Sequence, residues 1–90
     1  MTDRPRDTSY ATELARGVVK FKTGGEGRVE RLKIKKLNAI EIRFSWWQDK
    51  RMQPRPLDLS EESLLDLCED GVANKVFTTA FRERLRDILA

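Results

Sequence analysis

The sequence predicts an α+β domain in which a four-stranded antiparallel sheet is followed by two C-terminal helices packed on one face (ββββαα). Residues 18–59 alternate between apolar and polar side chains with the period of two that is typical of half-buried strands. From Ser60 onward, apolar residues recur with helical spacing. Because the strands all precede the helices, an antiparallel sheet covered on one face is the simplest arrangement.

The length of 90 residues indicates one small domain with a modest core. Hydrophobic residues make up 39% and charged residues 37%, which is typical of a globular chain and not of a disordered one. Residues 1–16 are polar and show no sustained periodicity. We assign 1–16 to a flexible N-terminal tail and 17–90 to a single domain.

The first two predicted strands, residues 18–23 and 28–36, flank the turn-forming sequence Gly24-Gly25-Glu26-Gly27. On both strands apolar and basic side chains alternate. The apolar set is Val19, Phe21, Leu32 and Ile34, and the basic set is Lys20, Lys22, Arg31, Lys33 and Lys35. Val29 falls on the basic side, which indicates a β-bulge near Glu30.

The third predicted strand, residues 40–47, has the clearest alternation in the chain. Its apolar set, predicted to face the core, is Ile40, Ile42, Phe44 and Trp46. Arg43 and Trp47 leave the opposite side and are predicted to be exposed. The fourth strand, residues 52–59, contains Pro54 and Pro56, which restrict it to a sheet edge. Its apolar residues Leu57 and Leu59 are assigned to the core face.

Two helices complete the predicted domain. Ser60 is a good N-cap, and two glutamates follow it in the first turn. Gly71 marks the end of this helix or a bend in it. Thr78 or Thr79 caps a second helix, whose inner face, predicted to pack on the sheet, carries Phe81, Leu85, Ile88 and Leu89.

The composition excludes most catalytic chemistry. The chain has no histidine and one cysteine, Cys68, so zinc sites, nucleophilic triads and an internal disulfide lack their parts. The glycine turn is not followed by Lys-Ser/Thr and is therefore not a P-loop. We expect no enzyme, no cofactor and no metal. No apolar run approaches the roughly 20 residues that span a bilayer. Residues 1–6 lack the apolar core of a signal peptide, so we expect no membrane association and a cytoplasmic location.

Charge is divided unevenly along the chain, with a net of +7 in residues 1–55 and −4 in residues 56–90. A basic sheet face with an exposed tryptophan is typical of proteins that bind single-stranded nucleic acid. The residues predicted to bind phosphates are Lys20, Lys22, Arg31, Lys33, Lys35 and Arg43. Trp47 would stack on a base, or it would serve as an anchor in a protein interface; both roles are open at this stage.

A resemblance adds to this interpretation. The segment Ile40-Glu41-Ile42-Arg43, followed by Trp47, Asp49, Met52, Pro54, Arg55 and the Leu59 that precedes an acidic helix start, resembles the positive-cofactor-four family of transcriptional coactivators. The resemblance implies a ββββα domain that dimerises and binds single-stranded DNA across its sheet. It assigns Arg43 and Trp47 to the binding strand and Arg55 to the basic segment after the loop.

The predicted function is therefore that of a protein that binds single-stranded DNA or RNA and regulates transcription or DNA metabolism. The C-terminal helix carries more apolar residues than one face of a short sheet requires, so we also expect a homodimer formed through it. The alternative is a small protein-interaction or inhibitor module, such as a phage- or plasmid-borne regulator. In that alternative, an acidic protein partner docks on the same basic face.

Overall fold

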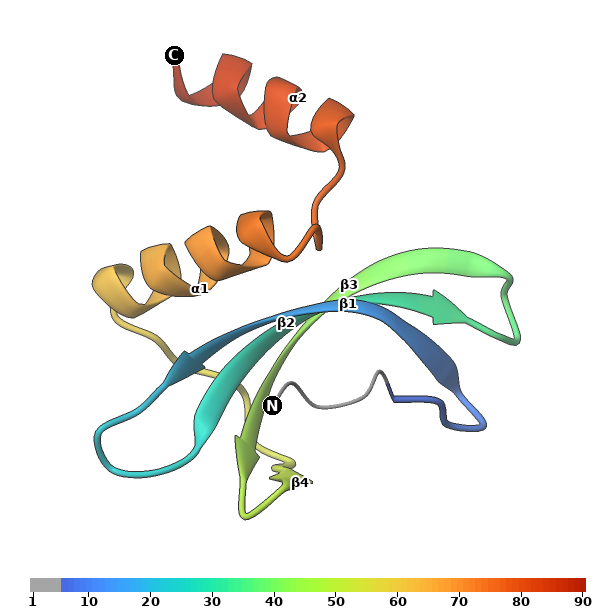
Figure 1. Ribbon diagram of the computed structural model, residues 1–90, viewed down its shortest axis with the longest axis vertical. Helices are drawn as coiled ribbons and strands as arrows, with labels where there is room; N and C mark the ends of the chain where they lie inside the picture. Colours follow the sequence, from blue (N-terminus) through green and yellow to red (C-terminus); the bar gives the residue numbers. More distant parts are fainter. Residues whose placement is uncertain (1–5) are drawn as a thin grey trace.

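The computed structural model describes residues 6–90 and has the predicted α+β class and ββββαα order (Figure 1). The elements are β1 (Ala11–Lys20), β2 (Glu26–Ile34), β3 (Ala39–Gln48), β4 (Arg51–Met52), α1 (Glu61–Ala73) and α2 (Thr79–Leu89). The strands form one antiparallel sheet in the order β1-β2-β3-β4. Each strand thus pairs with its neighbour in sequence, which short turns between antiparallel strands allow.

Strand β1 begins earlier than predicted. It starts at Ala11, so residues 11–16, which the sequence analysis assigned to a flexible tail, belong to the sheet. A β-bulge between Glu13 and Ala15 shifts the register and interrupts the period of two, which hid this half of the strand. The bulge predicted near Glu30 is wrong, because β2 pairs with β3 without a register shift from Glu26 to Ile34. Residues 1–5 of the predicted tail lie outside the described residues.

Strand β4 is much shorter than the predicted 52–59 segment. It pairs with β3 through Arg51 and Met52 alone, and the chain then runs without regular structure to α1. Pro54 and Pro56 lack the N–H groups that a longer ladder would need. The turn into β4 is tight, since Asp49 and Lys50 both have positive φ, at 52° and 64°.

The sheet has a small core on each face. On the face that carries α1, called the helix face below, Val29, Leu67 and Val76 are fully buried. On the opposite face, Ala11, Leu32 and Ile34 form a second cluster toward the other end of β2. Leu32 and Ile34 were predicted to share one apolar face with the residues of β3. That grouping is wrong. Val29 of β2 packs into the core on the helix face, whereas Leu32 and Ile34, toward the other end of the strand, pack into the core on the opposite face.

A close backbone contact seats α1 on β1. A Cβ atom on Gly17 would lie 2.6 Å from the backbone nitrogen of Gly71, so glycine at this position permits the approach. The Asp70 carboxylate, from the same turn of the helix, accepts a hydrogen bond of 2.6 Å from the backbone N–H of Val18. These contacts fix the C-terminal half of α1 over the middle of β1.

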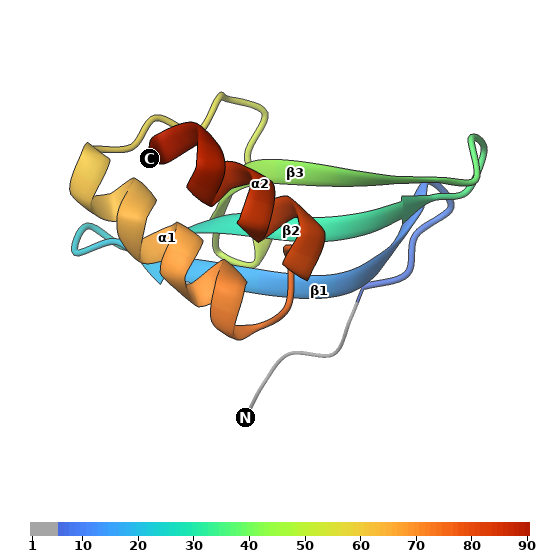
Figure 2. The same cartoon turned by 90° about the horizontal axis from the view of Figure 1, so that it is seen from above.

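The helices cover only part of the helix face. Helix α1 contacts β1 and β2, whereas α2 approaches none of the strands within residues 6–90. The predicted packing of α2 on the sheet is therefore wrong, and its predicted inner face, Phe81, Leu85, Ile88 and Leu89, is exposed. Viewed from above, the part of the sheet toward the β2–β3 turn extends well beyond both helices (Figure 2). Ile40, Ile42 and Phe44 were predicted as core residues, yet they are 45%, 39% and 47% exposed. No helix in residues 6–90 is long and apolar enough to cross a membrane.

Candidate functional site

The predicted basic residues do not share one face of the sheet. The strand register places Arg31 and Lys33 on the helix face, where Arg31 donates a hydrogen bond to the backbone carbonyl of Val76 at 3.3 Å. Lys20, Arg43 and Trp47 lie on the opposite face. The single basic face predicted from the sequence is therefore wrong. Alternation shows which residues share one side of a single strand. The pairing register between strands then decides which of these sides lie on the same face of the sheet.

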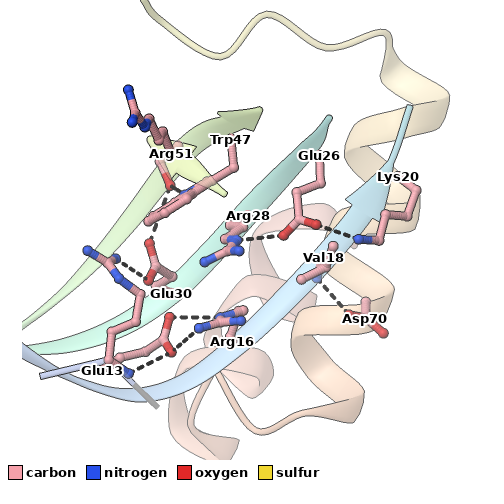
Figure 3. Close-up of polar contacts among 12 residues, drawn as sticks. Glu13, Arg16, Val18, Lys20, Glu26, Arg28, Glu30, Trp47, Arg51 and Asp70 are labelled. Carbon is pink, nitrogen blue, oxygen red and sulfur yellow. Dashed lines mark hydrogen bonds and ion pairs between the residues drawn. The ribbon is translucent and has the colours of Figure 1, made fainter. Parts of the chain in front are cut away.

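The two tryptophans occupy the reverse of their predicted positions. Trp47 is buried, with 6% of its surface exposed, and Trp46 is half-buried. The ring of Trp47 lies between two guanidinium groups, with Arg28 3.9 Å and Arg6 4.4 Å from its centroid. Its indole N–H donates to Ser45 Oγ at 2.8 Å (Figure 3). A base could stack on this ring only if one of the arginines moved away.

A buried carboxylate pair lies beside Trp47. The Oε1 atom of fully buried Glu30 accepts hydrogen bonds from Arg43 at 2.9 Å and from Ser45 at 3.3 Å. Its Oε2 atom accepts no hydrogen bond within residues 6–90 and lies 3.5 Å from Arg6 Nη1. Burial raises the pKa of Glu30, and the neighbouring Glu13 raises it further against the effect of Arg43.

The pKa of Glu13 moves in the opposite direction. Burial alone would raise it, but the neighbouring Glu30 and the hydrogen bonds from Arg16, one of them at 2.8 Å, lower it (Figure 3). Burial and the neighbouring groups together thus shift the two carboxylates in opposite directions, raising the pKa of Glu30 and lowering that of Glu13. This network ties β1, β2 and β3 together and occupies Arg43, which was predicted to bind phosphate.

Other predicted phosphate-binding residues also have intramolecular partners. Lys20 pairs with Glu26 on the neighbouring strand, and Lys35 pairs with Asp7 at 2.8 Å. Arg28 also contacts Glu26, at 2.6 Å. Burial would raise the pKa of Glu26, but hydrogen bonds from Lys20 and Arg28 lower it. By contrast, Lys22 and Lys33 are exposed and form no ion pair within residues 6–90.

Two pockets open at the end of the sheet where the β1–β2 turn meets the β3–β4 turn. The first, of about 500 Å³, is lined by Phe21 and Trp47 and by the cations Lys20, Arg28 and Lys50, together with Glu26 and Asp49. The second, of about 490 Å³, is lined by Phe21, Trp46, Arg55, Leu57 and Asp58, among others. Both volumes fall within the range of small-ligand pockets in proteins. We call this region the turn-end site.

Local backbone conformation builds the turn-end site. Gly24 and Gly25 have φ angles of 95° and 83°, which residues with a side chain rarely adopt. A Cβ atom on Gly25 would lie 2.8 Å from the Trp47 carbonyl oxygen and 3.3 Å from Trp46 Nε1. The glycines therefore let the turn close against both tryptophans and bring Phe21 beside them.

The turn-end site contains part of the predicted set. Lys20, Trp47 and Arg55 line its pockets, and exposed Lys22 lies between the lining residues Phe21 and Thr23. Arg31, Lys33, Lys35 and Arg43 lie elsewhere on the sheet. Four residues of the turn-end site do not follow from the sequence pattern: Phe21 and Trp46, whose alternation predicts a core position, and Arg28 and Lys50. The tight turns that flank these residues were the available signal.

Comparison with models of known protein families, with curated proteins and with solved structures finds no significant match. The described part of the chain, residues 6–90, contains no group of three or more histidine, cysteine or acidic residues that could hold a metal ion. The side chains at the turn-end site are aromatic rings, five cations with Lys22 included, and three carboxylates.

Proposed function

We propose that this protein binds single-stranded nucleic acid at the turn-end site, as a regulator of transcription or DNA metabolism in the cytoplasm. The observation that carries the proposal is a pair of pockets on the two faces of one sheet end, which share Phe21. One pocket is lined by Trp47 and the other by Trp46, and five cations lie around them. Aromatic rings beside cations suit bases and phosphates, which alternate along a single strand. The resemblance to the positive-cofactor-four family supports the same class of ligand.

The proposed roles differ from those expected from the sequence. Phe21 and half-buried Trp46 offer ring surface to a base, while Trp47 forms the covered wall of the first pocket. Lys22, Lys50 and Arg55 are exposed and contact phosphates. Lys20 and Arg28 contribute positive potential that Glu26 partly neutralises. The strand would thus cross the turn end of the sheet and not the length of one face.

The test is a titration of a labelled oligothymidine, followed by fluorescence anisotropy at several salt concentrations, with RNA and duplex DNA compared at matched salt. Each phosphate contact with a single strand contributes about −0.7 to the slope of log affinity against log salt. The Lys22→Ala/Arg55→Ala variant should flatten the slope by about 1.4. The matched control, Lys33→Ala/Lys35→Ala, removes the same charge at the other end of the sheet and should leave the slope unchanged.

The result that would overturn this placement is a flatter slope in the control pair with no change in the turn-end pair. A Trp46→Ala variant adds an independent readout, since loss of a stacked base should cost about 1–3 kcal/mol of binding free energy. The second candidate function, a module that docks an acidic protein on its basic surface, is favoured if neither DNA nor RNA binds at low salt. In that case an oligonucleotide would also fail to displace the captured protein.

A further inference from the structure

A second, chemically different surface lies on the helix side of the molecule. Large apolar side chains with 39–75% exposure occur there on three elements. They are Leu64, Leu65 and Val72 of α1, Phe81, Leu85, Ile88 and Leu89 of α2, and Ile40, Ile42 and Phe44 of β3. Helix α2 stands away from the sheet beyond α1 (Figure 1). A monomer rarely exposes this much apolar surface without a partner that covers it.

A groove joins the two helices within this surface. It has a volume of about 450 Å³ and is lined by Val72 of α1 and by Leu85 and Leu89 of α2, with Arg82 and Arg86 also contributing. On the side toward the sheet, the rings of Phe77 and Phe81 stack at 5.3 Å and hold the start of α2. The remaining apolar residues of α2 contact no strand in the described structure.

The charges of the two helices are complementary. Helix α1 carries five acidic residues and no basic one, and α2 carries three arginines and two acidic residues. Asp70 is occupied by the N–H of Val18. Glu61, Glu62, Asp66 and Glu69 form no ion pair within residues 6–90, nor do the arginines of α2. Each helix therefore presents exposed apolar residues beside charged residues that form no ion pair within residues 6–90: acidic residues on α1 and arginines on α2.

We propose that the occupant of this surface is a second copy of the same chain, with α2 of each copy packed on α1 of the other in a twofold arrangement. The surface is self-complementary because one chain carries both the acidic apolar helix and the basic apolar helix. A twofold axis makes the same contact twice, so the exposed apolar side chains of α1 and α2 are covered in both copies. Arg82 and Arg86 are one helical turn apart and would face the row formed by Glu62, Asp66 and Glu69.

Sedimentation velocity over a micromolar concentration range tests whether two copies of the chain form a dimer. The full chain should sediment as a dimer, and Leu85→Glu/Ile88→Glu should sediment as a monomer. Because α2 contacts no strand, this variant should keep the circular dichroism spectrum of the sheet and α1. The matched control is Leu37→Glu, which replaces a 65% exposed leucine outside this surface, next to the β2–β3 turn, and should remain dimeric. A wild-type chain that is monomeric throughout the range overturns the proposal.

Charge reversal tests the pairing of α2 with α1. Arg82→Glu/Arg86→Glu and Asp66→Arg/Glu69→Arg should each weaken the dimer by roughly 10–100-fold, since each double change affects the contact twice. The chain that carries all four changes should recover most of the wild-type affinity. A dimer that both reversals leave unchanged, or that the combined variant fails to restore, overturns the α1–α2 pairing. Oligothymidine binding by the same variants reports separately on the turn-end site.

Discussion

The ring of Trp47 is held by groups from three separate parts of the chain. Arg6 comes from the N-terminal segment, Arg28 from β2, and Ser45 from β3 itself. Cation–π contacts that are shielded from water contribute about 2 kcal/mol each, more than exposed ones. Trp47 therefore ties the segment before β1 to β2 and β3, and we expect its main contribution to be to stability.

The first prediction compares the two tryptophans. Trp47→Ala should lower the free energy of unfolding by about 3–5 kcal/mol, because it removes a buried ring and leaves two arginines without their aromatic contact. Trp46→Ala should cost about 1–2 kcal/mol, since its ring is half-buried and lines an open pocket. Urea denaturation of both variants measures the difference, and a larger loss in Trp46→Ala would contradict the observed burial.

The second prediction concerns the buried carboxylate Glu30. Its pKa in the folded protein is raised above the ordinary value of 4.5. Its contribution to stability is therefore complete below pH 4.5 and is lost as the pH rises through the raised pKa. Glu30→Gln does not titrate at this position. The stability of this variant relative to the wild type should therefore increase as the pH rises above 4.5 and then level off.

Glu26→Gln is the matched control for this pH dependence. The pKa of Glu26 is lowered, so its contribution is present above pH 4.5 and is lost as the pH falls through the lowered pKa. The difference in free energy of unfolding between Glu26→Gln and the wild type should change below pH 4.5 and stay constant above it. Chemical denaturation between pH 3 and pH 8 separates the two windows. If the difference in free energy of unfolding between Glu30→Gln and the wild type does not change with pH above 4.5, the pKa of Glu30 is not raised.

At the scale of elements, the contact between α1 and β1 gives the third prediction. Gly17→Ala should destabilise the fold by about 3 kcal/mol, because its Cβ would meet backbone atoms of Gly71 that cannot move without shifting α1. Gly27→Ala is the control on the same face. Its Cβ would meet the side chains of Phe21, Leu57 and Val19 at 3.2–3.3 Å, and side chains can adjust, so the cost should be about 1 kcal/mol.

Hydrogen exchange of the backbone amides shows which part of the fold Gly17→Ala destabilises. The Val18 amide, which donates to Asp70 in the wild-type chain, should lose protection when α1 is displaced. The amides of β3, which has no packing contact with α1, should keep their relative protection. Equal stability losses in the two glycine variants would show that the backbone approach of Gly17 and Gly71 is not limiting.

The elements differ in how well the sequence predicts them. Both helices and their caps follow from local signals, since Ser60 and Thr78 accept hydrogen bonds from the third residue of each helix. Strand β3 was also recognisable from its own alternation. The first half of β1 was not, because the bulge after Glu13 breaks the period there. The predicted length of β4 was too great. The alternation of apolar and polar residues continues to Leu59, but Pro54 and Pro56 prevent this segment from pairing with β3.

At the scale of the whole molecule, the proposed binding surface could be predicted from the sequence only in part. Lys20, Lys22 and Trp47 were identified from strand alternation and Arg55 from the family resemblance, and all four lie at or beside the turn-end site. Arg31 and Lys33 were grouped with them because strand alternation carries no information on how β1, β2 and β3 align. The exposure of Ile42 was equally unpredictable, since it depends on α1 lying over β1 and β2 and not over β3.

The last prediction follows from mass action on the whole molecule. If two copies unfold together, the melting temperature of the wild-type chain should rise with protein concentration, because association stabilises the folded state and not the unfolded one. Leu85→Glu/Ile88→Glu should show no such rise, and its melting temperature should match that of the wild type extrapolated to high dilution. Leu37→Glu should follow the wild-type concentration dependence. Differential scanning calorimetry over a hundredfold range of concentration makes the measurement, and a wild-type melting temperature independent of concentration would rule out a dimer that contributes to stability.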